Sequence, residues 1–315
     1  MRLNRPSQSR RRAGTSIVEL LVALVLFSLF GAITLVQLAT NGRSLSALTE
    51  RLDARSALWQ GSDVFAAELR PASVGGGDIL LATDSALWYR GFVASAVVCS
   101  TPTATMLELL PDSLASGMRP ATGMASAQAG DLLYLFDEGG RPGGADDRWL
   151  PLVVGAVAAA SGVCAGSPYL DPILDAGRVG YRLRVQAGGA IPATVVTGAA
   201  VRILRPARLA LYRTSPADWY LGFADWNVTL GRWNVVQPVA GKYRPYAISP
   251  RPTGLGIAVR DSLNGAVSIP GPVTTASRIE LALRTQALTR QLGVGPVSVL
   301  RTDSLSTLVG LRNRQ

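Results

Sequence analysis

An apolar stretch near the N-terminus constrains this 315-residue chain more than any other feature. Residues 17–38 read IVELLVALVLFSLFGAITLVQL, and Glu19 is the single charged residue among them. At a rise of 1.5 Å per residue, a helix of about 20 residues crosses a hydrocarbon layer of about 30 Å. The stretch therefore predicts a membrane-spanning helix over residues 15–40.

The charges that flank this stretch predict its orientation. Arg10, Arg11 and Arg12 lie directly before it, whereas the other flank carries Arg43 and then charges of both signs. Basic residues stay on the cytoplasmic side, so we expect the N-terminus in the cytoplasm and the chain after about residue 40 outside. An ordinary secretory signal has its small-residue cleavage site after the apolar run, but here Gly14 precedes it.

Residues 11–24, RRAGTSIVELLVAL, resemble the class III signal peptide of type IV prepilins and type II secretion pseudopilins. In that family a prepilin peptidase cuts after the glycine and methylates the new N-terminus. The resemblance implies a leader over residues 1–14, cleavage between Gly14 and Thr15, and an N-methyl group on Thr15. The family usually has phenylalanine where this chain has Thr15. Glu19 falls at the fifth mature position, where the family has its glutamate.

The cost of a charge in lipid also indicates a functional role for Glu19. An ionised carboxylate in lipid is expensive and persists where it has a partner or a function. The α-amino group of Thr15, in the same subunit or in the one below, is a suitable cation. The alternative is that the carboxylate only extends to the membrane interface.

After the apolar stretch, residues 41–70 form an amphipathic pattern that continues the helix. One helix from Ser16 to Leu69 is expected, about 80 Å long, and Pro71 with the glycines at 75–77 marks its end. We expect its outer half to pack on the following domain through a face made of Leu45, Leu48, Leu52, Trp59, Ala66 and Leu69.

Two glycines, Gly31 and Gly42, interrupt the helical pattern. Each costs up to about 1 kcal/mol relative to alanine inside a helix. They indicate either local bending during assembly or close helix packing in lipid, and the pattern favours neither.

Residues 71–315 read as a β-rich domain. Short runs rich in Val, Leu, Ile, Tyr and Trp alternate with turn residues up to SRIELALRTQALT, and the Pro- and Gly-rich residues 238–272 predict long connections. The expected fold is α+β, with the long helix packed on a mostly antiparallel domain. The order of its hairpins, with RLALYRT and DWYLGF paired and SRIELALRT as the closing strand, loosely resembles the minor pilins of the W class and pseudopilin J.

The net charge of +10 does not point to nucleic acid. Five arginines and no acid precede Thr15, so loss of the leader would leave +5. The remaining basic residues are dispersed and include a single lysine, Lys242, with no basic block interleaved with aromatics. DNA contact by a surface filament is kept as a minor hypothesis.

Cys99 and Cys164 each lie in a short apolar run. A disulfide is the natural prediction if the domain is exported, and two buried free thiols are the alternative.

The chain has no histidine, which removes the usual general base, the commonest zinc ligand and charge-relay triads. No enzyme activity and no cofactor are expected. A calcium loop, which some pseudopilins have, could be drawn through the acidic run 137–149; its candidate ligands are Asp137, Glu138, Asp146 and Asp147. The spacing fits no EF-hand, and a solvated hairpin tip is the favoured interpretation.

The resemblance predicts a minor pilin or pseudopilin that assembles through its N-terminal helix into a type IV pilus or a type II secretion pseudopilus, with the filament tip or priming of assembly as expected roles. Its partners would be the prepilin peptidase, other subunits and an inner-membrane assembly platform. It would lie in the inner membrane with a periplasmic domain, then in a filament. The alternative is a single-pass, membrane-anchored enzyme or ligand-binding module.

Overall fold

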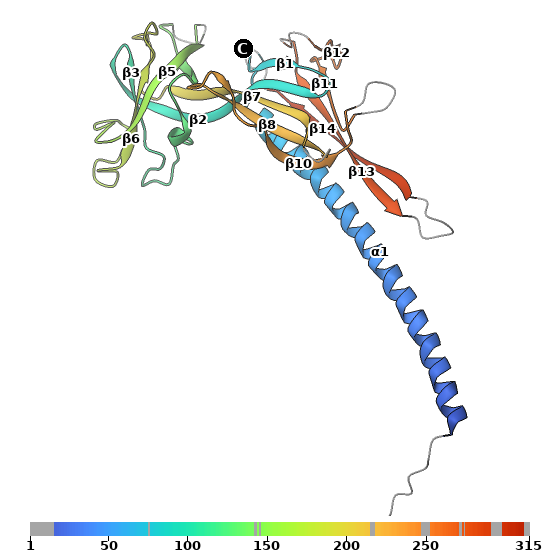
Figure 1. Ribbon diagram of the computed structural model, residues 1–315. Helices are drawn as coiled ribbons and strands as arrows, with labels where there is room; N and C mark the ends of the chain where they lie inside the picture. The colour runs from blue at the N-terminus through green and yellow to red at the C-terminus, as the bar shows by residue number, and fades with distance from the viewer. Residues whose placement is uncertain are drawn as a thin grey trace, which may run out of the picture. The chain divides into compact units, whose positions relative to one another are not determined.

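The computed structural model describes residues 16–311, apart from residues 75, 142–143, 145, 215–217, 247–252, 271–272, 274 and 291–297 (Figure 1). The chain divides into two compact units. One holds the chain up to Asp53 together with Leu288–Leu300, and the other holds Ala54–Ala287 and the residues from Arg301 onward.

The N-terminal helix α1 runs over Ile17–Leu69, 53 residues, and matches the predicted bounds to within one residue. Glu19 lies in its first turn. The helix ends where Pro71 follows, because proline cannot donate the next backbone hydrogen bond. A long N-terminal helix followed by a mostly antiparallel β domain confirms the α+β class.

Ten strands form the larger sheet, and neighbouring strands in it pair in antiparallel fashion. A short 3-10 helix, η1 (Met124–Ser126), precedes β4. The strands are β1 (Ile79–Ala82), β2 (Ala86–Thr103), β3 (Met106–Leu109), β4 (Leu132–Asp137), β5 (Arg148–Ser161), β6 (Val179–Val185), β7 (Ala200–Arg213), β8 (Trp219–Asn227), β9 (Arg232–Trp233) and β10 (Gln237–Tyr243).

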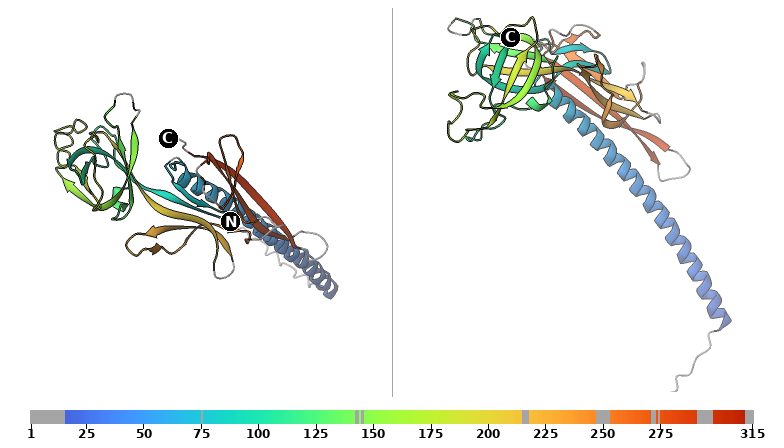
Figure 2. Two further views of the ribbon diagram at one scale, coloured as in Figure 1. Left: turned by 90° about the horizontal axis from the view of Figure 1, so that it is seen from above. Right: turned by 60° about the vertical axis from the view of Figure 1, so that its left-hand side comes forward.

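Part of this sheet closes on itself. The order β2-β3-β6-β5-β4-β7 ends on a strand that also pairs with β2, so six strands form a ring (Figure 2). Side chains such as Leu107, Leu133, Leu183 and Ile203 fill its interior and are buried. We call this six-stranded part the barrel.

The rest of the β structure packs on the end of α1. A second sheet, ordered β12-β11-β13-β14, consists of β11 (Leu255–Arg260), β12 (Ala266–Val267), β13 (Arg278–Arg290) and β14 (Ser298–Gly310). Its buried residues share one core with β1, the first half of β2, the second half of β7, β8, β10 and the end of α1. We call this part the helix-packed lobe.

One sequence expectation about this lobe was wrong. The run SRIELALRT is not the closing strand, because β14 follows it. The Pro- and Gly-rich region 238–272 holds most of β10 and all of β11 and β12 beside its connections, and these strands pair with β8, with β13 and with one another.

Candidate functional site

The predicted processing residues Gly14 and Thr15 lie outside the described residues. Glu19 is described, and its side chain is exposed in the first turn of α1. A carboxylate at this end of a helix is stabilised by the positive end of the helix dipole, typically by about 0.3–1 kcal/mol. The carboxylate thus stands at the start of α1 with no charged neighbour within the described residues.

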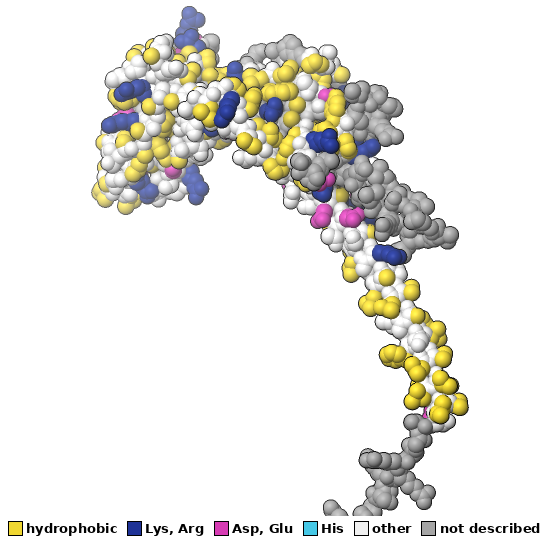
Figure 3. All heavy atoms as spheres, in the orientation of Figure 1, with side chains coloured by type: hydrophobic (Ala, Val, Ile, Leu, Met, Phe, Trp, Pro, Cys, Tyr) yellow, Lys and Arg dark blue, Asp and Glu magenta, His cyan; other side chains and the backbone are white. Residues whose placement is uncertain are grey.

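The first half of α1 exposes its apolar side chains on all sides. Ile17 and Phe27 are each 79% exposed, and hydrophobic side chains dominate the surface of this stretch in Figure 3. By length and composition, α1 is able to cross a membrane. An apolar surface of this extent marks a lipid or protein contact.

Three hydroxyl groups of the apolar stretch form hydrogen bonds within the helix. Ser28, Thr34 and Thr40 each donate a side-chain hydrogen bond of 2.8 Å to the carbonyl oxygen four residues earlier. In lipid an unsatisfied hydroxyl is costly, and this back-bonding meets the need without a partner helix. The hydroxyls of these three residues are therefore compatible with a hydrocarbon surrounding.

The second half of α1 is buried along one stripe. Small residues, Ala54, Ala57 and Gly61, let the sheets approach closely, and Phe65 and Leu69 reach the core with no exposed surface. A Cβ added at Gly61 would collide with the Tyr243 hydroxyl and lie 2.9 Å from Leu283 Cδ1. The requirement for a small residue here is thus steric.

This stripe differs from the predicted face. Leu45, Leu48, Leu52 and Trp59 are all more than half exposed, while Ala66 is partly buried and Leu69 is fully buried. The expectation selected large apolar residues, but the sheets pack against the small ones. Within the described side chains, the buried residues of α1 run from Ala54 to Leu69.

Two tyrosines anchor the buried half of α1. The Tyr243 hydroxyl on β10 donates to the Ala57 carbonyl at 2.6 Å, and the Tyr89 hydroxyl on β2 donates to Glu68 at 2.8 Å. Burial raises the pKa of Tyr243 well above its ordinary value. Burial, reinforced by the Glu68 charge, raises the pKa of Tyr89 as well. Both hydroxyls therefore stay protonated and keep donating.

The segment after the helix, residues 70–78, is held by arginines from the sheet. Arg202 on β7 donates to the Pro71 carbonyl at 2.8 Å and lies 3.5 Å from the Asp78 carboxylate. Arg90 on β2 donates to the Gly76 carbonyl at 3.1 Å. Burial raises the pKa of Asp78, while a hydrogen bond from the Ser73 backbone N–H and the two arginines oppose that rise. No sequence motif pointed to this cluster; its members are isolated residues of strands that pair far along the chain.

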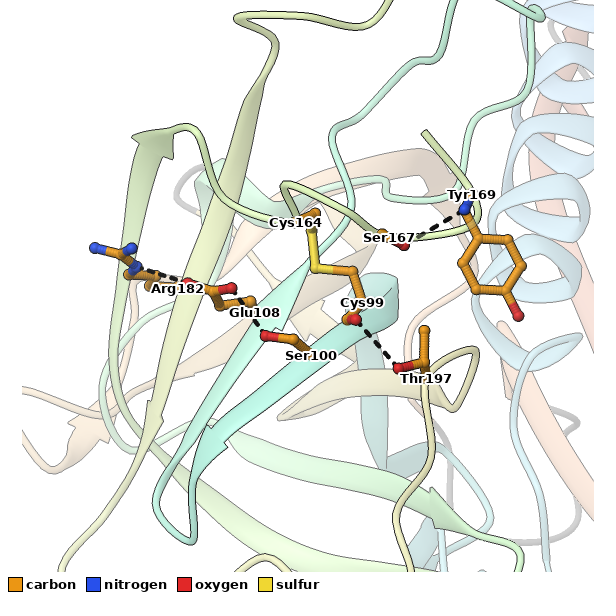
Figure 4. Close-up of a disulfide and its surroundings, with 8 residues drawn as sticks. All are labelled: Cys99, Ser100, Glu108, Cys164, Ser167, Tyr169, Arg182 and Thr197. Atoms are coloured by element: carbon orange, nitrogen blue, oxygen red, sulfur yellow. Dashed lines mark hydrogen bonds and ion pairs between the residues drawn. A yellow bond between two sulfur atoms is a disulfide. The ribbon is translucent and has the colours of Figure 1, made fainter. Parts of the chain in front are cut away.

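Cys99 on β2 and Cys164 after β5 form a disulfide, with their Cα atoms 5.4 Å apart (Figure 4). Both are buried in a small cluster with Leu110 and Val163. The bridge links residues 65 positions apart, and closing such a loop removes about 4 kcal/mol of chain entropy from the unfolded state. It fastens the β5–β6 connection to the barrel.

The four acidic candidates for calcium are arranged as a hairpin tip between β4 and β5. Asp146 accepts backbone hydrogen bonds from Gly140 at 2.8 Å and from Arg141 at 3.2 Å. Asp137 is buried and pairs with Arg148 at 3.2 Å, whereas Glu138 and Asp147 are exposed.

Burial opposes ionisation of Asp137, but hydrogen bonds from Thr194, the Gly139 N–H and Arg148 outweigh it and lower its pKa. The carboxylates of Asp137 and Asp146 thus bond within the hairpin itself. In the parts of the chain that the structure describes, no group of three or more His, Cys, Asp or Glu side chains could hold a metal ion.

Comparison of the chain with protein-family models, curated proteins and solved structures gave no match.

Proposed function

We propose that this chain is a minor pilin or pseudopilin that is cut between Gly14 and Thr15 and assembles into a filament through α1. The observation that carries the proposal is the sequence from Arg11 to Leu24, with its glycine before the apolar run and Glu19 five residues beyond that glycine. The division of α1 supports it, because one half exposes apolar side chains and the other is buried in the β domain.

In this proposal the first half of α1 exchanges one apolar surrounding for another. It lies in the inner membrane before assembly, with the β domain in the periplasm, and packs beside the helices of other subunits afterwards. Glu19 pairs with the α-amino group of Thr15, which offsets the cost of a carboxylate in a medium of low dielectric constant. The prepilin peptidase and an inner-membrane assembly platform are the further partners.

The size of the β domain favours a minor subunit, placed at the filament tip or active in priming. A domain with a barrel in addition to the helix-packed lobe is bulky for repetitive packing in a thin fibre.

Mass spectrometry of the N-terminus tests the cleavage. The full chain is coexpressed with a prepilin peptidase, and we expect a mature terminus at an N-methylated Thr15. Gly14→Leu is the matched variant that should keep the leader. An intact Met1 terminus in the parent chain would refute the proposal and favour a membrane-anchored enzyme or binding module.

The role of Glu19 needs a separate experiment, because cleavage alone does not require the carboxylate. Glu19→Gln should be cleaved normally but should incorporate poorly into filaments, measured as the fraction of this subunit in sheared filament preparations. Glu50→Gln, an exposed acid on the same helix, is the matched control and should incorporate normally. Normal incorporation of Glu19→Gln would remove the proposed pairing but not the cleavage.

A further inference from the structure

The barrel and the helix-packed lobe are connected by two neighbouring strands. β2 contributes Tyr89 to the core of the lobe and Val98 to the core of the barrel. β7 contributes Leu209 to the first and Val201 to the second. The strands pair throughout, so the chain enters the barrel on β2 and leaves it on β7 (Figure 2).

A ribbon of two strands is a weak connection by itself. Two-stranded ribbons are marginally stable and twist more than wider sheets. The register of β2 with β7 also shifts between Phe92 and Ala94, at the junction, and such irregularities bend a strand. Backbone pairing alone would allow the barrel to change its orientation relative to the helix-packed lobe.

Arg202 makes the first additional link. It lies on the barrel half of β7, opposite Tyr134 of β4 in register. Its guanidinium donates to the Pro71 carbonyl at 2.8 Å and lies 3.5 Å from the buried Asp78 carboxylate. A barrel strand is thereby bonded directly to the segment that ends α1.

Arg90 makes a second link in the opposite direction. It lies on the lobe side of the junction, where its register partner is Pro206. Its guanidinium donates to the Tyr134 hydroxyl of β4 at 2.6 Å and to the Gly76 carbonyl at 3.1 Å. The Tyr134 hydroxyl itself donates to Gly76 at 3.0 Å. One carbonyl after the helix is thus held from both sides of the junction.

Arg205 makes the third link and is more buried than Arg202. It donates two hydrogen bonds to Asp131, at 2.6 and 2.8 Å, and Asp131 has no exposed side-chain surface. Its other nitrogen lies 3.4 Å from Asp225 on β8. One guanidinium therefore joins a carboxylate of the barrel to a carboxylate of the lobe, and bidentate charged bonds of this kind fix geometry as well as distance.

We propose that Arg90, Arg202 and Arg205 lock the barrel to the helix-packed lobe, so that the barrel and the buried end of α1 turn as one rigid body. Three side chains bridge the junction, and each bonds to groups on both sides of it or to the segment that ends the helix. In a filament subunit such a lock would present the barrel in one orientation. The lock does not depend on the proposed function and is tested on the isolated chain.

The experiment measures distances by double electron–electron resonance on the full chain in detergent micelles. Spin labels are attached at Met118→Cys in the barrel and Leu263→Cys in the lobe, two exposed positions outside the links. We expect one narrow distance distribution in the parent chain and a broadened or split one when Arg90→Met, Arg202→Met and Arg205→Met are combined. Arg182→Met removes a pair with Glu108 inside the barrel and should leave the distribution narrow.

Amide hydrogen exchange of the two cores shows that each part remains folded in the variants. If the combined variant does not fold, Arg205→Lys serves instead, because it keeps the charge but loses the bidentate bond to Asp131, and it should also broaden the distribution. The lock is overturned if a folded variant that lacks the links keeps the narrow distance distribution of the parent chain. An equally broad distribution in the parent chain overturns it as well.

Discussion

The two halves of α1 have the same backbone geometry and opposite surroundings. Up to Asp53 the helix exposes nearly all its large apolar side chains, whereas from Ala54 to Leu69 it buries a stripe in the core of the lobe. Burial of apolar surface is the main stabilising term in folding. The second half obtains it within this chain, whereas the first half does not obtain it from the side chains that the structure describes.

Two phenylalanines give the sharpest test of this difference. Phe65 has no exposed surface, and Phe27 is 79% exposed. Phe65→Ala should lower the free energy of unfolding by about 3–5 kcal/mol, because it removes buried area and leaves a cavity. Phe27→Ala should change it by less than about 0.5 kcal/mol. Urea titration of the full chain in micelles, followed by tryptophan fluorescence, measures both.

Equal losses for the two phenylalanine variants would break the comparison. They would mean that the first half of α1 is folded against something in the same chain. A small loss for both would instead mean that the contact of α1 with the lobe is weak.

Alanine substitutions at two glycines test the same difference between the buried and exposed halves of α1, because each adds a methyl group. Gly61→Ala should destabilise the lobe by about 1–3 kcal/mol, because the new methyl group meets Tyr243 and Leu283. Gly31 and Gly42 have no heavy atom within 4 Å of an added Cβ. Gly31→Ala should therefore leave the stability of the lobe unchanged, as read by thermal unfolding. A stable Gly61→Ala protein would show that the helix and sheets are not in close contact.

High pH should weaken the buried half of α1 through the two tyrosines that bond to it. The folded protein raises the pKa of Tyr89 and Tyr243, while the unfolded chain releases these protons near pH 10. The stability that depends on the neutral hydroxyls is present below pH 10 and is lost as the pH rises further, by up to about 1.4 kcal/mol per pH unit for each tyrosine. Unfolding free energies measured from pH 9 to pH 11 give the slope.

The matched variant for the alkaline series combines Tyr89→Phe and Tyr243→Phe. It should begin less stable, because two hydrogen bonds to α1 are lost, but its loss of stability with pH should be shallower. A slope as steep as that of the parent chain would assign the alkaline loss to other groups.

The bounds of α1 were predictable because their signals are local. The apolar run, Pro71 and the following glycines lie side by side in the sequence. Most long strands were also predicted from their residue runs. The barrel was not, because its closure depends on β2 pairing with β7, about 110 residues later, and residue patterns do not specify distant partners.

The contacts of the candidate site were less predictable than its residues. Gly14, Thr15 and Glu19 stand out in the sequence, but Asp78, Arg202 and Arg205 do not, because their roles appear only when the strands pair. The predicted face of α1 was wrong for a related reason. Residue size suggested Trp59, whereas the close approach of Tyr243 and Leu283 requires a small residue at Gly61.

The smallest expected effect concerns that tryptophan. Trp59 lies in the buried half of α1 by position but is 61% exposed. Trp59→Gln should therefore change the free energy of unfolding by no more than about 0.5 kcal/mol, since substitutions away from packed features are usually that mild. Guanidinium titration followed by far-UV circular dichroism is the measurement, because it does not rely on the deleted fluorophore. A loss as large as that of Phe65→Ala would place Trp59 in the core and restore the face that the sequence suggested.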